Sequence, residues 1–363
     1  MKKEIATILA QLGNRTDQQT GAISAPIYLS TTYAHPNFGE STGFDYTRTK
    51  NPTRSILEEG LAQLEGGAGA VATSSGMSAI QLAFALFPVG SHFLVSRDLY
   101  GGSYRFFQEL ETQGVAFFTY FTDLTDLKKQ LSAEVSAVFL ETPTNPLMNV
   151  TDISSVAKLT QANDALLLVD NTFLTPLRQQ PLLAGADIVI HSGTKFLSGH
   201  NDLLAGVVVA KDPAVYQRLA FLANTTGPCL GSFDSWLFIR SLKTFPIRFE
   251  KQEENAKKLV DFLQNHPAVK EVLYPGVGAM ISFRLQEKTQ VPKLLQRLQL
   301  ISFAESLGGV ETLITYPTTQ THADIPQELR ESYGLTADLL RLSVGIEGVN
   351  DLVADLNQAL KEE

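Results

Sequence analysis

Between residues 69 and 210 the chain alternates short apolar runs with segments of helical periodicity, and this alternation limits the possible folds more than any other feature. The apolar runs are 69–73, 92–95, 116–121, 135–140, 165–169, 186–190 and 205–210. Strands that are buried on both faces read as continuous apolar runs, and helices placed between them favour parallel pairing. The sequence therefore predicts an α/β domain with a mostly parallel, seven-stranded sheet.

The regions on either side of this alternation predict two further parts. Residues 1–50 have one short apolar helical stripe and then a stretch rich in Thr, Ser, Gly and Tyr without periodicity. We expect an N-terminal arm that reaches a neighbouring subunit. A helix begins at Asn51-Pro52, which supply a capping side chain and a residue suited to the first turn, and it ends before Gly66.

After about residue 240 the pattern changes to a long helical stretch at 247–264, a strand at 279–285 and a helix at 291–299. This order is typical of a smaller α+β domain. The expected division is thus an arm at 1–50, an α/β domain at 51–240 and a smaller α+β domain at 241–363.

The composition excludes several classes of protein. Hydrophobic residues make up 44% and charged residues 18% of the 363 residues, which is enough for a large buried core. The formal charge of -9 disfavours a nucleic-acid partner. The single cysteine allows no intramolecular disulfide and no thiolate cluster for a metal, and it fits the reducing cytosol. We expect no leader peptide, and no apolar run approaches about 20 residues, so we expect a cytoplasmic protein without a membrane span.

Two strand ends carry the side chains of greatest chemical interest. Asp170 follows the apolar run at 165–169, and His191-Ser192-Gly193-Thr194-Lys195 follows the run at 186–190. Ligands of open α/β sheets bind beyond the carboxyl ends of strands. Each feature alone has an ordinary explanation, because a strand-end aspartate often caps a helix and a lone lysine is usually solvated. Together they match a carboxylate that keeps a pyridine nitrogen protonated and an amine that forms a Schiff base.

A third element supplies hydrogen-bond donors for a phosphate. Ser74-Ser75-Gly76-Met77 lies at the junction of the 69–73 strand with a helix that runs through Ile80 and Phe84. Backbone N–H groups at a helix start bind phosphate, and glycine permits close backbone approach. By itself this loop is only an ordinary helix N-terminus.

Several motifs, in order along nearly the whole chain, resemble the cystathionine γ-synthase/γ-lyase family of trans-sulfuration enzymes, which use pyridoxal phosphate. They are Tyr-Thr-Arg at 46–48, Leu-Tyr-Gly-Gly at 99–102, Glu-Thr-Pro-Thr-Asn-Pro at 141–146, Asp-Asn-Thr-Phe at 170–173 and Ser-Gly-Thr-Lys at 192–195. The resemblance implies the fold of type I pyridoxal-phosphate transferases, the aspartate-aminotransferase-like architecture.

The resemblance also implies a set of cofactor contacts. Lys195 is the expected Schiff-base lysine and proton shuttle, Asp170 pairs with the pyridine nitrogen, and Tyr100 stacks on the ring and assists proton transfer. The residues expected to hold the phosphate or line the cofactor are Gly76, Met77, Thr172, Ser192 and Thr194. Tyr46 and Arg48 are expected to complete the phosphate site of the adjacent subunit, which makes a dimer the minimal active unit and a tetramer the expected assembly. Without the family motif, both would be ordinary residues of a solvated loop.

Substrate contacts follow from the same resemblance. Arg341 matches an arginine that binds the substrate α-carboxylate with its planar fork; without the family it would suggest an ion pair with a buried acid. Asn145 and Ser306 match residues beside it. Glu305 falls where enzymes that handle cystathionine carry a glutamate for the second ammonium of a two-headed amino acid. Arg105 falls where some γ-synthases bind a distal carboxylate, although a solvated helix arginine explains it equally well.

Within the family we expect γ-replacement, which forms cystathionine from an O-acylhomoserine and cysteine. Lys195 moves the α-proton and then a β-proton, the γ-acyloxy group leaves and the thiol adds. Gly102 stands where methionine γ-lyases have a cysteine, which disfavours that activity. The short segment after Gly276, with no His- and Gly-containing insertion, resembles Firmicute γ-synthases that use O-acetylhomoserine and often accept sulfide.

Other functions stay open at this stage. A cystathionine γ- or β-lyase has the same cofactor apparatus and is the first alternative. A non-catalytic sensor that binds pyridoxal phosphate is more remote, because such a protein is expected to lose Lys195 or Tyr100. A nucleotide-binding enzyme is disfavoured, because Gly66-Gly67-Ala68-Gly69 lacks the dinucleotide spacing.

Overall fold

A computed structural model describes residues 3–361 of the chain. Seven strands form the main sheet in the order β1-β7-β6-β5-β4-β2-β3. Their bounds are β1 Gly69–Thr73, β2 Ser91–Ser96, β3 Ala116–Phe121, β4 Val135–Glu141, β5 Leu166–Asp170, β6 Ile188–Ser192 and β7 Gly206–Ala210. β2 pairs in parallel with β3 and β4, and β5 pairs in parallel with β6, whereas β7 is antiparallel to both β1 and β6. The prediction of a mostly parallel, seven-stranded α/β sheet is confirmed.

The chain divides into two compact units, Met1–Pro88 with Leu166–Pro246 and Val89–Ala165 with Ile247–Glu363. The domain boundaries at residues 50 and 240 stay a prediction.

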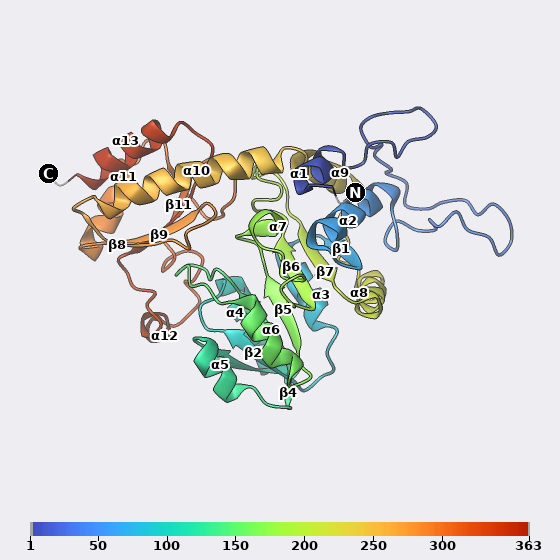
Figure 1. The fold of residues 1–363 in the computed structure, drawn as a ribbon, viewed down its shortest axis with the longest axis horizontal. Helices are drawn as coiled ribbons and strands as arrows, with labels where there is room; N and C mark the ends of the chain where they lie inside the picture. Colours follow the sequence, from blue (N-terminus) through green and yellow to red (C-terminus); the bar gives the residue numbers. More distant parts are fainter. Residues whose placement is uncertain (1–2, 362–363) are drawn as a thin grey trace. The chain divides into compact units, whose positions relative to one another are not determined.

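The first unit holds β1, β5, β6 and β7 together with six helices of the described chain. These helices are α1 Ile5–Ala10, α2 Pro52–Glu65, α3 Gly76–Phe84, α7 Thr175–Arg178, α8 Pro213–Thr226 and α9 Ser232–Leu242. The predicted start and end of α2 are confirmed: the Asn51 side chain accepts hydrogen bonds from the backbone N–H groups of Thr53 and Arg54, and Gly66 adopts φ 72° at the end. Between α1 and α2 the chain forms irregular loops that extend away from α2 (Figure 1).

The second unit holds β2, β3 and β4 and a smaller sheet of five strands in the order β10-β11-β12-β9-β8. The strands of this sheet are β8 Val269–Leu273, β9 Met280–Leu285, β10 Ser302–Phe303, β11 Leu313–Thr315 and β12 Leu339–Ser343. The helices are α4 Gly101–Thr112, α5 Leu124–Gln130, α6 Ile153–Gln161, α10 Phe245–Gln264, α11 Val291–Arg297, α12 Gln327–Ser332 and α13 Val349–Leu360, with a short 3-10 helix at Lys288–Gln290. The smaller sheet with its helices agrees with the α+β character predicted for the C-terminal region; α11 and α13 pack against each other (Figure 1).

Each unit has its own apolar core. In the first, β6 and β7 are the most enclosed strands, and Val189 and Val208 have no exposed surface. In the second, the Phe107 ring of α4 stacks on Phe118 with centroids 4.5 Å apart and meets the edge of Phe139. These buried strands hold the loops at their ends in place. No helix within residues 3–361 is long and apolar enough to cross a membrane.

Candidate active site

The ends of β5 and β6 place three predicted cofactor residues next to one another in the first unit. Asp170 is the last residue of β5 and Ser192 the last of β6, and the strands pair in register there. The backbone N–H of Thr172 donates to Oδ1 of Asp170 over 2.9 Å, and the backbone N–H of Ser192 donates to Oγ1 of Thr172 over 2.9 Å. Thr172 thus connects the carboxylate of one strand with the loop of the other.

Asp170 occupies an environment that disfavours a bare carboxylate. Burial raises the pKa of Asp170, while its hydrogen bonds to Thr172 and the nearby His191 lower it. A desolvated carboxylate is stabilised when a cationic N–H group is placed against it. A protonated pyridine nitrogen is such a group.

Lys195 lies on the turn that follows β6. Its backbone N–H donates to the carbonyl of Ser192 over 3.2 Å, and its own carbonyl accepts from Gly199 over 2.8 Å. Thr194 is fixed to Ala205 by hydrogen bonds through its backbone and its hydroxyl. The backbone that carries the half-buried Lys195 amine is therefore well defined.

The N-terminus of α3 forms a cradle beside Ser192. Ser75 caps the helix by accepting from the N–H of Ser78, which leaves the N–H groups of the first residues, Gly76 and Met77, at the helix start. A Cβ added to Gly76 would lie 2.9 Å from Cβ and 3.0 Å from Oγ of Ser192. Glycine is needed for this close approach, and the resulting cluster of N–H and O–H donors suits a phosphate.

In the second unit, Arg341 of β12 is buried among neutral oxygens. Its Nη1 donates to Oδ1 of Asn145 over 2.8 Å, and its Nη2 donates to the carbonyl of Ser306 and to Oγ1 of Thr315, each over 3.1 Å. Nε of Arg341 has no hydrogen-bond partner among the described residues. Burial lowers the pKa of Arg341 to about 10, and Tyr100, Glu141 and Glu305 act in the opposite direction. This geometry differs from a buried ion pair and leaves the guanidinium able to bind an anion.

Ser306 and Glu305 form the rim of this arginine site. Ser306 adopts φ 100°, a backbone conformation that is unfavourable for a residue with a side chain and that is found mostly where a site requires it. Its carbonyl is thereby directed to Arg341. Glu305, the residue before it, is exposed.

Tyr100 directly precedes α4, and its backbone is fixed by a hydrogen bond. Its N–H donates to Oε2 of Glu141 over 3.0 Å, while its side chain is 39% exposed. A Cβ on Gly102 would lie 2.4 Å from Cε1 of the Tyr100 ring. Only glycine fits beneath the ring in this position.

His322 is a residue of this site that sequence reasoning missed. Its buried Nε2 lies 3.2 Å from the carbonyl oxygen of Leu99 and 3.0 Å from that of Asn145, and its Nδ1 lies 2.8 Å from Oγ1 of Thr321. A neutral ring with the proton on Nε2 satisfies all three contacts. Burial, with the charge of Arg341, lowers the pKa of His322 to about 4. The only signal in the sequence was a histidine in a polar loop.

The remaining predicted residues lie on the surface of their units. The Arg48 guanidinium lies 5.5 Å from the centroid of the exposed Tyr46 ring, and its Nε donates to Oδ1 of Asn224 over 3.4 Å. Arg105 is 65% exposed and pairs with Asp324. Within residues 3–361 no group of three or more His, Cys, Asp or Glu side chains is arranged to hold a metal ion.

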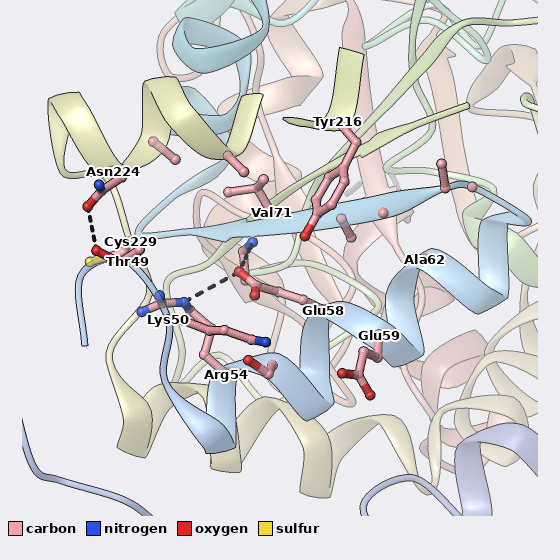
Figure 2. A pocket seen from close by; sticks show the side chains of 18 of the residues that line it. Thr49, Lys50, Arg54, Glu58, Glu59, Ala62, Val71, Tyr216, Asn224 and Cys229 are labelled. Atoms are coloured by element: carbon pink, nitrogen blue, oxygen red, sulfur yellow. Dashed lines mark hydrogen bonds and ion pairs between the residues drawn. The ribbon is translucent and has the colours of Figure 1, made fainter. Parts of the chain in front are cut away.

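The first unit also has a cavity of about 670 Å³ bounded by α2, β1, α8 and the segment that contains Arg48 (Figure 2). Glu58 projects into it and accepts a hydrogen bond from the N–H of Ala72 over 3.0 Å, with Nε of Arg54 3.4 Å away. Burial raises the pKa of Glu58 to about 7. The sequence offered no signal for this cavity, because its walls come from distant segments.

Together the fold and these residues define a type I pyridoxal-phosphate enzyme, because a strand-end carboxylate, a lysine turn and a phosphate cradle fit the nitrogen, the aldehyde and the phosphate of that cofactor. Residues 6–361 match the family described as Cys/Met metabolism PLP-dependent enzyme. The chain belongs to this family, and pyridoxal phosphate is its cofactor.

Individual relatives agree with this assignment. A cystathionine gamma-synthase/O-acetylhomoserine (thiol)-lyase of Bacillus subtilis is 53% identical over 99% of this chain and 97% of its own length. Cystathionine beta-lyase MetC of the same organism is 44% identical over 100% and 98% of the two chains. The crystal structure of cystathionine gamma synthase from Xanthomonas oryzae pv. oryzae, in complex with aminoacrylate and cysteine, superposes with a TM-score of 0.96 at 39% identity. The match covers 99% of this chain and 98% of that chain.

Proposed function

We propose that this enzyme forms cystathionine by γ-replacement, from an O-acylhomoserine, with acetyl as the expected acyl group, and cysteine. The observation that carries the proposal is the buried Arg341, whose hydrogen bonds go to neutral oxygens and whose Nε is unpaired among the described residues. Such a guanidinium suits the α-carboxylate of an amino acid. The higher identity to the Bacillus subtilis synthase than to the lyase of that organism favours synthesis over cleavage.

The cofactor residues are proposed to divide the work as follows. Lys195 holds the cofactor and carries protons, Asp170 faces the pyridine nitrogen, and Tyr100 stacks on the ring. Gly76, Met77, Ser192 and Thr194 bind the phosphate, and Thr172 keeps Asp170 and Ser192 in position. Pyridoxal phosphate, when bound, supplies the electron sink that makes loss of a proton from the α-carbon possible.

The substrate residues are proposed to orient the amino acid for that proton transfer. Arg341 binds the α-carboxylate, and Asn145 and Ser306 fix the guanidinium through an oxygen each. Glu305 is exposed and has the charge needed to pair with the second ammonium of a two-headed product. Arg105 is proposed to receive a distal carboxylate, which requires that it leave Asp324.

In the proposed reaction the Cγ–O bond of the O-acylhomoserine breaks and a Cγ–S bond to cysteine forms. The carboxylate leaving group departs with the bonding electrons, and the cysteine thiol loses its proton. Lys195 takes the α-proton and then a β-proton, which allows the γ-group to leave, and protons are returned to both carbons after the thiolate has added.

A product assay tests this proposal against its main alternative, a cystathionine γ- or β-lyase. The protein is given O-acetylhomoserine with cysteine and, separately, cystathionine alone, and the products are identified by mass. Cystathionine as the main product of the first mixture supports the synthase. Release of pyruvate or 2-oxobutyrate from cystathionine, at a higher kcat/KM than that of cystathionine formation in the first mixture, would overturn the proposal in favour of a lyase.

The proposed role of Lys195 has a separate test. Lys195→Ala, purified and dialysed, is expected to lose the visible absorbance of the attached cofactor, whereas Lys211→Ala, at an exposed position after β7 in the first unit, is expected to keep it. Unchanged absorbance in Lys195→Ala would contradict the assignment and favour a different attachment residue.

We also propose that the active enzyme is a homodimer, assembled further into a tetramer, in the cytoplasm. The irregular segment that carries Tyr46 and Arg48 supports the dimer, because two exposed phosphate-binding residues next to each other suit a partner subunit. Phe38 in the same segment is fully exposed, and large apolar side chains on an extended arm are usually covered in an assembly. The assembly is testable by analytical ultracentrifugation.

A further inference from the structure

A buried carboxylate lies directly behind the cofactor residues of the first unit, and nothing in the proposed reaction uses it. Glu65 is the last residue of α2, and only 1% of its side-chain surface is exposed. Its Oε1 lies 2.6 Å from Nε2 of His191, which is itself 1% exposed. Such a group is expensive to bury unless it has a structural or functional partner.

The same oxygen of Glu65 contacts a second strand end. The side-chain amide of Asn171 donates to Oε1 over 3.3 Å, and Asn171 is also held by Gln179 through two hydrogen bonds, of 2.8 Å and 3.0 Å. Asn171 follows Asp170, and His191 precedes Ser192. One atom of Glu65 therefore ties together the neighbours of two cofactor residues.

The side chains at these strand ends form two separate groups, because neighbouring residues of an extended chain project in opposite directions. Asp170, Thr172 and Ser192 share one hydrogen-bonded network. Asn171 and His191 project away from it and converge on Glu65. The phosphate cradle depends on this arrangement, because Ser192 is in close contact with Gly76.

We propose that Glu65 is a positioning residue for the cofactor, which fixes the ends of β5 and β6 through its hydrogen bonds to Asn171 and His191. By holding these two residues it sets the distance between the Asp170 carboxylate and the Ser192 phosphate donor, and a rigid cofactor requires that distance to be constant. The burial of Glu65 and His191 supports this role, since shielding from water makes the hydrogen bonds strong and directional. The proposal concerns cofactor binding and does not depend on whether the enzyme is a synthase or a lyase.

The test measures the affinity of the apoprotein for pyridoxal phosphate, by titration followed through protein fluorescence, alongside kcat and KM of the holoenzyme. Glu65→Leu removes the acceptor oxygen and is expected to weaken cofactor binding by about tenfold or more, with the KM for the amino-acid substrate changed by less than about threefold. Glu65→Gln retains an acceptor oxygen in the same place and is expected to retain cofactor affinity within about threefold. Glu59→Leu, an exposed position on the same helix, is the matched control and is expected to bind like the parent protein.

Two results would overturn the proposal. One is a Glu65→Leu protein that binds the cofactor like the parent. The other is equal weakening in Glu65→Leu and Glu65→Gln, which would assign the effect to the charge of Glu65 and not to its hydrogen bonds. If Glu65→Leu yields no folded apoprotein, His191→Phe removes the stronger of the two hydrogen bonds from the other partner, and the same loss of affinity is expected. Parent-like affinity in that protein would likewise contradict the role of the pair.

Discussion

Nη1 of Arg341 donates a 2.8 Å hydrogen bond to Oδ1 of Asn145, so that a buried guanidinium is hydrogen-bonded to a neutral amide. An amide oxygen orients the guanidinium without neutralising it, whereas a carboxylate would compete with a bound anion. The arrangement keeps the charge available for an anion, as the proposed contact with a substrate carboxylate requires. It also predicts which changes at this site the enzyme tolerates.

Arg341→Lys is expected to lower kcat/KM by on the order of 100-fold, because a lysine ammonium keeps the charge but not the planar, forked donor geometry. The loss should appear mainly in KM. Steady-state kinetics with O-acetylhomoserine and cysteine measure it, with Arg218→Lys, at an exposed position of α8, as the control that keeps the parent values. A change of less than about threefold in Arg341→Lys would assign substrate binding to another residue.

Gly102→Ala is expected to lower kcat by on the order of 10- to 100-fold, because the added methyl group would lie 2.4 Å from the Tyr100 ring and must displace it. The neighbouring Ser103→Ala shortens a buried side chain of the same helix and serves as the control. Both proteins are compared by turnover and by urea unfolding. Full activity in a folded Gly102→Ala protein would show that the ring position of Tyr100 is unimportant.

Glu58 is expected to make the protein less stable as the pH rises. Its pKa of about 7 in the folded protein lies above the ordinary value of 4.5. Between pH 4.5 and pH 7 the folded protein therefore holds a proton that the unfolded chain has released. The free energy of unfolding therefore falls as the pH rises through this window, by up to about 3 kcal/mol. Glu58→Gln should remove this dependence, and the exposed Glu59→Gln on the same helix should keep it. Urea unfolding at pH 5 and pH 8 distinguishes them, and parallel pH profiles for Glu58→Gln and the parent would refute the burial argument.

His322 is expected to make the protein less stable as the pH falls below about 6.5. Its pKa of about 4 in the folded protein lies below the ordinary 6.5, so the unfolded chain binds a proton that the folded protein excludes. The neutral His322 therefore gives its full contribution to the free energy of unfolding above about pH 6.5. This contribution should decrease by about 2 kcal/mol between pH 7 and pH 5. His322→Gln should show a smaller decrease than the parent, whereas His92→Gln, at an exposed position of β2, should match the parent. The measurement is urea unfolding at the two pH values.

The strands of the main sheet were predictable because each is a nearly continuous apolar run between polar segments. The ends of β5 and β6 differ by one or two residues from the predicted runs, since Asp170 and Ser192 are polar residues that still belong to the ladders. The smaller sheet was only partly predictable. β10 and β11 are two and three residues long, so no periodicity develops before they end.

The proposed cofactor residues could be named from the sequence for a chemical reason. Gly76, Asp170 and Lys195 lie on short motifs at strand ends, and few reactions need a phosphate cradle, a carboxylate and an amine together. His322 and Glu65 were not predictable, because their roles come from partners 106 to 223 positions away in the chain. No local pattern records such a contact.

By itself, the sequence determined the α/β fold, the cofactor and the residue types proposed to bind it, because hydrophobic periodicity and motif chemistry are local properties of a chain. Only the tertiary structure decided that Arg341 is held by neutral oxygens, that Gly102 lies under the Tyr100 ring and that Glu65 ties two strand ends together. These relationships depend on packing between distant segments, which sets burial and hydrogen-bond partners that sequence spacing does not contain.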